Sequence, residues 1–336
     1  MEDQEKKTFS AIVGQEDLKQ HLQNAISMNK ISHAYIINGE KDSGKMMLAE
    51  AFAAALLCEK GGNEACMECH SCRQAAGRNN PDIIYVTHEK PGVISVDDIR
   101  RQINDSVVIK PYAATRKIYI VDEAEKMNPQ AQNALLKTIE EPPAYAVILL
   151  LTTNAKGFLP TILSRCITLN MQPASDAVIQ KLLMERYHVV DYQADMCVAF
   201  AQGNVGKAIR LASSEEFAEM KMSVLRLVQE LPEMDLGGVN QAVGEMETLK
   251  PQIDEYFDLL TLWYRDVLLY KSAGNQVPLV FGDELFRLKK QAESLSYARI
   301  EQILTEISAS RDRLRANVNF ELVMELLLLT MKGDEI

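Results

Sequence analysis

The strongest constraint on the fold is the stretch AYIINGEKDSGKMMLAEAFAAALL, residues 34–57. Its first residues form an apolar run ending in glycine, which favours a strand, and its last residues, rich in Ala, Leu and Met, favour a helix. The polar loop between them matches the phosphate-binding pattern G-x-x-x-x-G-K-[ST] at Gly39, Gly44 and Lys45. In such a loop the glycines let backbone N–H groups converge on phosphate oxygens, and the lysine adds a positive charge. The sequence therefore predicts an α/β domain of the nucleotide-binding type.

The last position of this loop departs from the pattern. Met46 stands where a serine or threonine hydroxyl would coordinate magnesium. A thioether is too soft a ligand to replace that hydroxyl, so we expect no magnesium ion at the loop. Binding of ATP or ADP without hydrolysis stays open, because the backbone donors of the loop do not depend on Met46.

Further apolar runs predict three more strands, at residues 82–87, 118–121 and 146–154. The run at 146–154 is almost continuously apolar, which is typical of a parallel sheet covered on both faces, and we expect it to be the last strand of the core. A helix should begin after Asn128, with Pro129 at its first position, and stop at Pro142 and Pro143. The alternation of strands and helices favours a parallel sheet flanked by helices.

Two carboxylates follow the predicted strand at 118–121. Asp122 suits a magnesium ligand, and Glu123 suits a group that polarises an attacking water. We expect this pair to lie on a strand next to the one that precedes the phosphate loop. The simpler alternative is a solvated helix start, where a glutamate is favoured electrostatically.

Four of the six cysteines fall within residues 58–72, namely Cys58, Cys66, Cys69 and Cys72. In a reducing compartment such a cluster is typical of zinc, because thiolates are preferred zinc ligands and disulfides do not persist there. Four thiolates would complete a closed, tetrahedral, structural site. His70 is an alternative to one of the four, and free thiols on a loop are the simpler alternative.

The second half of the chain is predicted to be helical. Strands disappear after about residue 175, and residues 175–214 predict two or three short helices around the turn QGNVGKA. Beyond residue 216 apolar residues recur with helical spacing, most regularly in the two helices near residues 300–307 and 320–331. The pattern indicates a helix bundle, for which core packing is the simplest explanation.

The charge of the chain disfavours independent binding to nucleic acid. Its 36 basic and 47 acidic residues give a net charge of -11, which repels a phosphate backbone unless a local basic patch or a partner compensates. A freestanding zinc-dependent nucleic-acid binder is also disfavoured, because aromatics are not interleaved with basic residues near the cysteines. The first residues lack the apolar run of a signal peptide, and no stretch has the ~18 apolar residues of a membrane span. We therefore expect a cytoplasmic protein.

Several segments together carry a family resemblance: FSAIVGQEDLKQHLQNAI, SHAYIINGEKDSGK, the four-cysteine module, VDEAEKMNPQAQNALLKTIEEPP and LLLTTNAKGFLPTILSRC. They closely resemble the bacterial clamp-loader subunits of DNA polymerase III, which are AAA+ proteins. The resemblance runs through the first 170 residues and, more loosely, to RLRANVNFELVMELLLL near the end. It implies an AAA+ P-loop domain at 1–173 with a zinc module at 58–72, a small helical lid at 174–214 and an all-α collar domain at 215–336.

The resemblance also assigns the family's motifs to positions in this chain. Its Walker A loop corresponds to Gly39, Gly44 and Lys45, its Walker B pair to Asp122 and Glu123, and its first sensor to Thr153.

The family's SRC motif corresponds to Ser164, Arg165 and Cys166. In the family this arginine reaches a nucleotide held by the next subunit, as an arginine finger supplied in trans, and such fingers contribute ~10³ to 10⁵ in rate. The simpler alternative for Arg165 is a surface ion pair.

Two departures separate the chain from the motor subunits of the family. Met46 removes the magnesium-binding hydroxyl, and Gly206 stands where the motor subunits carry the arginine of the second sensor, with Lys207 one step later. Both losses disable hydrolysis in cis and leave Arg165 untouched, so Glu123 would be vestigial. The resemblance therefore implies a delta-prime-like, non-motor subunit.

Such a subunit would work in a hetero-oligomeric ring with gamma or tau and delta subunits. The ring would load the sliding clamp onto primed DNA, driven by ATP hydrolysis in its motor subunits. The alternative is a catalytically active gamma/tau-like ATPase, since Lys45, Asp122 and Glu123 are all present.

Overall fold

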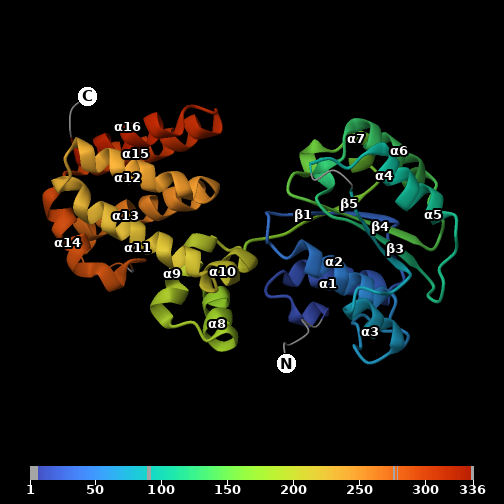
Figure 1. Ribbon diagram of the computed structural model, residues 1–336. Coiled ribbons are helices and arrows are strands. Elements are labelled where there is room, and N and C mark those ends of the chain that lie inside the picture. Colours follow the sequence, from blue (N-terminus) through green and yellow to red (C-terminus); the bar gives the residue numbers. More distant parts are fainter. Residues whose placement is uncertain (1–6, 89–91, 275–276, 278, 334–336) are drawn as a thin grey trace. The chain divides into compact units, whose positions relative to one another are not determined.

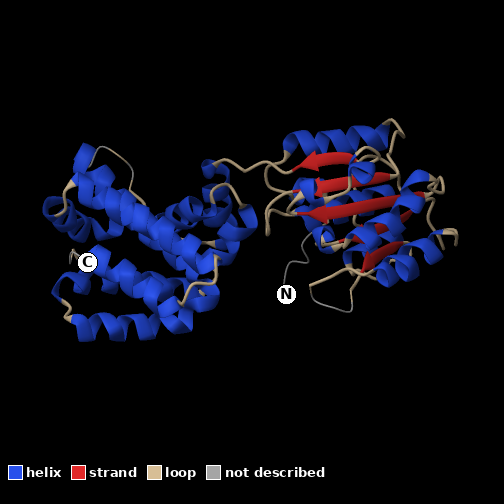
Figure 2. Ribbon diagram, turned by 90° about the horizontal axis from the view of Figure 1, so that it is seen from above, coloured by secondary structure: helices blue, strands red, loops and turns tan. Residues whose placement is uncertain are grey.

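The computed structural model describes residues 7–88, 92–274, 277 and 279–333 of the chain. These divide into two compact units, one comprising Met1–Ile179 with Gly203–Lys207 and the other comprising Gln180–Gln202 with Ala208–Ile336. The first unit holds the sheet, and the second is helical (Figures 1 and 2). The predicted class, a parallel sheet flanked by helices and followed by a mostly helical region, is confirmed. The three-part division at residues 173 and 214 stays a prediction.

The sheet of the first unit has five parallel strands in the order β2-β3-β4-β1-β5. Their bounds are β1 Ala34–Asn38, β2 Ile83–Val86, β3 Lys117–Val121, β4 Ala146–Thr152 and β5 Ile167–Asn170. Two sequence predictions were wrong here. Strand β4 lies between β1 and β3, so the phosphate loop and the acidic pair do not follow neighbouring strands. The run at 146–154 is not the last strand, because β5 pairs with the far side of β1.

Helices cover both faces of this sheet (Figure 1). One face packs against α1 Glu16–Ser27, α2 Lys45–Leu56 and α3 His70–Ala76, and the other against α4 Val96–Ile99, α5 Asp105–Val107, α6 Pro129–Glu140 and α7 Pro160–Leu163. Alternate residues of β1 and β4 contribute to the two apolar clusters, and every residue of β3 and β4 is buried. This two-sided burial explains the apolar runs in the sequence.

Local signals in the sequence set the bounds of α6. The side chain of Asn128 accepts a hydrogen bond from the backbone N–H of Ala131, and Pro129 occupies the first helical position, as predicted. The helix ends at Glu140, two residues before the predicted stop at Pro142 and Pro143.

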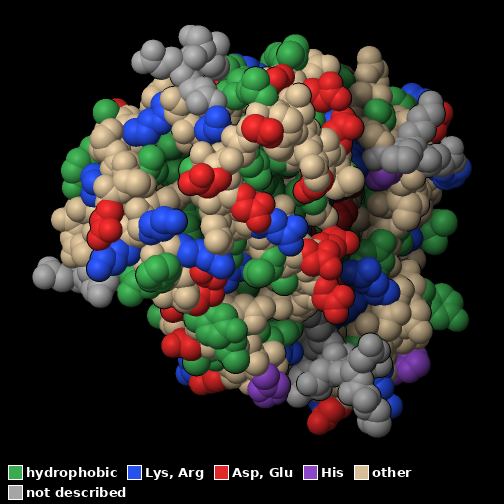
Figure 3. All heavy atoms as spheres, turned by 60° about the vertical axis from the view of Figure 1, so that its left-hand side comes forward, with side chains coloured by type: hydrophobic (Ala, Val, Ile, Leu, Met, Phe, Trp, Pro, Cys, Tyr) green, Lys and Arg blue, Asp and Glu red, His purple; other side chains and the backbone are tan. Residues whose placement is uncertain are grey.

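The remaining α-helices follow β5 without further strands among the described residues. They are α8 Asp176–Tyr187, α9 Asp191–Ala201, α10 Val205–Ala212, α11 Glu215–Glu230, α12 Leu236–Met246, α13 Ile253–Ala273, α14 Leu285–Ser294, α15 Tyr297–Arg315 and α16 Phe320–Lys332. Helix α13 is central to the second unit, because it packs against α11, α14 and α15 and buries Trp263 and Tyr264. No helix in the described part of the chain is long and apolar enough to cross a membrane. Acidic and basic side chains are interspersed over the face in Figure 3.

A buried carboxylate fixes the segment between α5 and β3. Asp82, at the start of β2, accepts hydrogen bonds from the backbone N–H groups of Tyr112, Ala113 and Ala114 at 2.6, 3.0 and 2.9 Å. The Asp82 side chain is buried, so these three donors replace the water that a charged carboxylate needs. These hydrogen bonds therefore anchor residues 112–114 to Asp82 beside β2.

Replacing Asp82 with Asn is expected to lower the free energy of unfolding by about 2 kcal/mol, since one oxygen becomes an amide facing N–H donors. Chemical denaturation of the full chain measures the change. Asp105→Asn, at an exposed position, is the matched control and should leave the transition unchanged. Equal transitions for the two variants would show that the anchoring contacts contribute nothing.

Candidate functional site

The phosphate loop connects β1 to α2, as predicted. Gly39 continues the sheet by donating its N–H to the carbonyl of Thr152 at 3.0 Å. Gly44 has a φ of 91°, a left-handed conformation that favours glycine, and it is the residue from which α2 begins. Gly44 is thus favoured by its backbone conformation, whereas at Gly39 an added Cβ would lie 2.8 Å from the side chains of Met171 and Ser43.

The lysine of the loop is directed at the loop's own backbone. The Nζ of Lys45 donates to the carbonyl oxygens of Gly39, at 2.8 Å, and of Glu40. Burial lowers the pKa of Lys45, while the carboxylates of Glu125 and Asp122 act against this shift. The positive charge therefore faces an acidic surrounding as well as two carbonyl groups.

Two methionines pack around the loop. Met46 is half-buried and packs against the apolar cluster beneath α1 and α2. Met171, the residue after β5, covers the other side: a Cβ placed on Gly39 would lie 2.8 Å from the Met171 side chain. Met171 was missed in the sequence because it lies 132 residues after Gly39, and no local pattern marks this contact.

The two acidic residues after β3 point to different partners. Asp122 accepts a hydrogen bond from the backbone N–H of Glu123 at 2.9 Å. Glu123 has a φ of 47°. Its carboxylate forms an ion pair with Lys126 at 2.5 Å and lies 3.9 Å from His88 Nε2. Glu123 is therefore engaged with basic neighbours, Lys126 from its own turn and His88 from the segment after β2.

A third carboxylate, not singled out in the sequence, contacts the predicted sensor. Thr153, directly after β4, donates its hydroxyl to Glu125 Oε1 at 2.7 Å. Burial of the carboxyl acts to raise the pKa of Glu125, but the hydrogen bonds that it accepts, from the Thr153 hydroxyl first, together hold the pKa below its usual value. Glu125 is the last residue of the string DEAE, which is typical of a helix start, and this pattern does not indicate a contact with Thr153.

The segment Gly203–Lys207 also reaches the phosphate loop, within the first unit. The Asn204 amide donates to the carbonyl of Lys41 at 2.7 Å. Gly206 lies so near Asp42 that an added Cβ would be 2.2 Å from its carbonyl oxygen. The resemblance places Gly206 where the family's motor subunits carry an arginine, but the sequence does not indicate this backbone contact.

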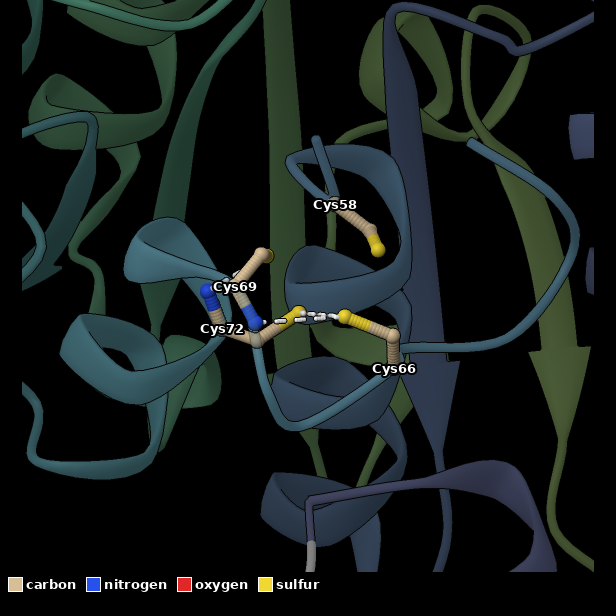
Figure 4. A group of neighbouring side chains, drawn as sticks. All are labelled: Cys58, Cys66, Cys69 and Cys72. Carbon is tan, nitrogen blue, oxygen red and sulfur yellow. Dashed lines mark hydrogen bonds between the residues drawn. The ribbon is translucent and has the colours of Figure 1, made fainter. Parts of the chain in front are cut away.

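The four cysteines converge on one point, as Figure 4 shows. One sulfur from each of Cys58, Cys66, Cys69 and Cys72 lies within 4.8 Å of the others, and the Sγ atoms of Cys66 and Cys72 are 3.9 Å apart. Two backbone N–H groups, of Cys69 and Cys72, point at the sulfurs of Cys66 and Cys69. Such a compact donor set fits a structural zinc ion, whose tetrahedral thiolates lie at about 2.3 Å from the metal.

The protonation of these thiols differs with their surroundings. Backbone hydrogen bonds from Cys69 and Glu68 lower the pKa of Cys66 to about 6, whereas burial raises the pKa of Cys72. A zinc ion would supply the charge that keeps a buried thiolate stable. His70 lies in α3 and is not part of the sulfur cluster.

Arg165 follows α7 at the surface of the first unit. Its guanidinium forms an ion pair with Glu140 at 3.1 Å and donates to the Thr161 carbonyl and the Ser164 hydroxyl. The Arg165 and Glu140 side chains are 40% and 47% exposed. The surface ion pair of the simpler reading is thus present, and the arginine is at the same time accessible.

The structure therefore gathers Lys45, Asp122, Thr153 and Glu125 near the carboxyl ends of the central strands, where parallel α/β sheets bind ligands. Arg165 makes its polar contacts with Glu140, Thr161 and Ser164 instead. The arrangement has the parts of a nucleotide site, but the loop lysine and the loop backbone are already engaged within the chain.

Comparison with known proteins gives consistent matches over both units. A family profile described as "DNA polymerase III, delta subunit" matches residues 14–175, and one described as "DNA polymerase III, delta subunit, C terminal" matches residues 225–333. The chain is 32% identical to DNA polymerase III subunit delta' of Bacillus subtilis, over 93% of this chain and 94% of that protein.

The chain is also similar to other proteins at lower identity. DNA polymerase III subunit tau of Bacillus subtilis is 29% identical over 79% of this chain and 50% of its own length. Among solved structures, a DNA polymerase III gamma subunit-related protein from Thermotoga maritima is 22% identical, with a TM-score of 0.46, covering 94% of this chain and 98% of that one.

Proposed function

Since this chain belongs to the family of DNA polymerase III subunit delta', we propose that it is a non-motor clamp-loader subunit that supplies Arg165 in trans to a neighbouring ATPase subunit. The observation that carries the proposal is the accessible guanidinium of Arg165 within the SRC motif, held by surface contacts alone. An exposed ion pair contributes little free energy, about 0–1 kcal/mol. Glu140 can therefore release Arg165 to a more strongly charged phosphate.

The chain's own loop supports a non-motor role. Met46 presents a thioether, packed against the core, where magnesium needs a hydroxyl. Gly206 brings no side chain toward a phosphate. We infer that the loop does not hydrolyse ATP, whether or not it binds a nucleotide.

The partners follow from the family. We propose a hetero-oligomeric ring with gamma or tau and delta subunits, in which the helices of the second unit serve as the collar. The assembly loads the sliding clamp onto primed DNA, and the net charge of -11 fits a subunit that reaches DNA through its partners.

For the cysteine cluster we propose a structural zinc ion held by Cys58, Cys66, Cys69 and Cys72. Zinc would supply a closed link between the end of α2 and the start of α3. The donor set has no open position for a substrate, so a catalytic role is not part of the proposal.

The first test is reconstitution with motor subunits and Arg165→Ala. Assembly should persist. DNA-stimulated ATP hydrolysis should fall by the part of total turnover that comes from the nucleotide site facing Arg165, because an arginine finger contributes ~10³ to 10⁵ in rate at its site. Glu140→Ala removes the same ion pair but keeps the arginine, so it should leave hydrolysis intact. Unchanged hydrolysis with Arg165→Ala would refute the role in trans.

The second test separates this function from an active gamma/tau-like ATPase. Purified alone, the chain should show no sustained ATP turnover with or without primed DNA, since no hydroxyl is available to bind magnesium. Turnover that disappears in Lys45→Ala would instead establish the active ATPase.

The third test is metal analysis of the purified chain, expected to give about one zinc per chain. Cys66→Ser should lower both zinc content and the melting temperature, whereas Cys197→Ala, outside the cluster, should keep the full zinc content. A metal-free wild-type chain that melts at the same temperature with and without added zinc would contradict the proposal.

A further inference from the structure

Five residues from the helical part of the chain belong structurally to the phosphate-loop unit. Gly203–Lys207 groups with the first unit, although the residues before and after it group with the second. The carbonyl of Gly203 accepts a hydrogen bond from the N–H of Ala174 at 2.9 Å, and Gly203 has a φ of 86°. This anchors one end of the segment close to the residues that follow β5.

Asn204 connects this segment to the phosphate loop with the two ends of one amide. Its Oδ1 accepts from the backbone N–H of Lys207 at 3.0 Å, which caps the first turn of α10. Its Nδ2 donates to the carbonyl of Lys41 at 2.7 Å and lies 3.4 Å from Glu40 Oε2. Asn204 is 7% exposed, so a lost hydrogen bond here is not simply replaced by water.

Gly206 makes the second contact, through its backbone. An added Cβ would lie 2.2 Å from the carbonyl oxygen of Asp42 and 3.1 Å from its carbon, so no other residue fits without moving the loop. The missing side chain is thus what allows the segment Gly203–Lys207 to approach the loop this closely. Where the family's motor subunits have an arginine, this chain has a direct backbone contact.

The loop is held from its other side as well. Lys45 donates to the carbonyls of Gly39 and Glu40, and Met171 covers Gly39. The N–H of Met171 donates to the carbonyl of Asn38 at 2.8 Å, which extends the pairing of β5 with β1. The loop is therefore enclosed by contacts that come from the chain itself.

We propose that Asn204 and Gly206 form a latch that fixes the phosphate loop in one conformation whether or not nucleotide is present. The phosphate loop and the start of α10 are joined by one side-chain amide and one backbone contact, neither of which needs a phosphate. The latch rests on contacts within this chain. Only its consequence, a steady platform for Arg165 at the other end of β5, rests on the proposed function.

Hydrogen exchange of the full chain, read by mass spectrometry, tests the latch. In the wild type, exchange of residues 39–45 should be the same with and without millimolar ATP. Asn204→Asp keeps the cap of α10, because aspartate is an equally good cap, but it cannot donate to Lys41 and adds repulsion near Glu40. Exchange of the loop should then rise about five- to tenfold while that of α10 stays unchanged.

Gly206→Ala examines the same joint from the other side and should also speed exchange of residues 39–45, because the added methyl group displaces the Asp42 carbonyl. This variant decides the matter if Asn204→Asp does not fold. Wild-type exchange rates in both variants, or a wild-type loop whose exchange changes with ATP, would overturn the latch. Neither outcome depends on hydrolysis by a neighbour, so failure of the latch and failure of the Arg165 proposal are distinguishable.

Discussion

The packing of helices on both faces of a parallel sheet determines where every candidate group lies. Because all five strands run in one direction, the residues that follow β1, β3 and β4 emerge at the same edge. The phosphate loop, the acidic turn and Thr153 are therefore neighbours in space although they are separated by up to about a hundred residues. Strand β5 runs in the same direction on the far side of β1, so the chain passes from Arg165 to Met171 beside the loop.

Features with a local cause were predictable from the sequence. The cap at Asn128, the glycines of the loop and the cysteine cluster are each set by a few adjacent residues, and the structure has all three where the sequence places them. The roles proposed for Arg165 and for the phosphate loop involve a neighbouring subunit or a nucleotide, and no spacing within one chain encodes either.

Features with a long-range cause were missed or misplaced. Strand β5 is a short edge strand with one buried residue in four, so it has no apolar run to reveal it. The position of β4 between β1 and β3 follows from packing order, which hydrophobic patterns do not report. Asn204 reaches Lys41 across 163 residues, and an asparagine before a helix is ordinarily just a cap.

The cysteine cluster lies at the end of α2 that is far from the phosphate loop. This helix begins at the phosphate loop with Lys45 and ends next to Cys58, while buried Cys72 contacts the Ala54 carbonyl at 4.0 Å. Both ends of one rigid helix are thus held by groups of the chain, the loop's self-contacts at one and the thiol cluster at the other. On the proposed function, the absence of a magnesium-binding hydroxyl at Met46, the glycine at position 206 and the contacts at both ends of α2 would all favour a subunit whose shape does not depend on its own nucleotide.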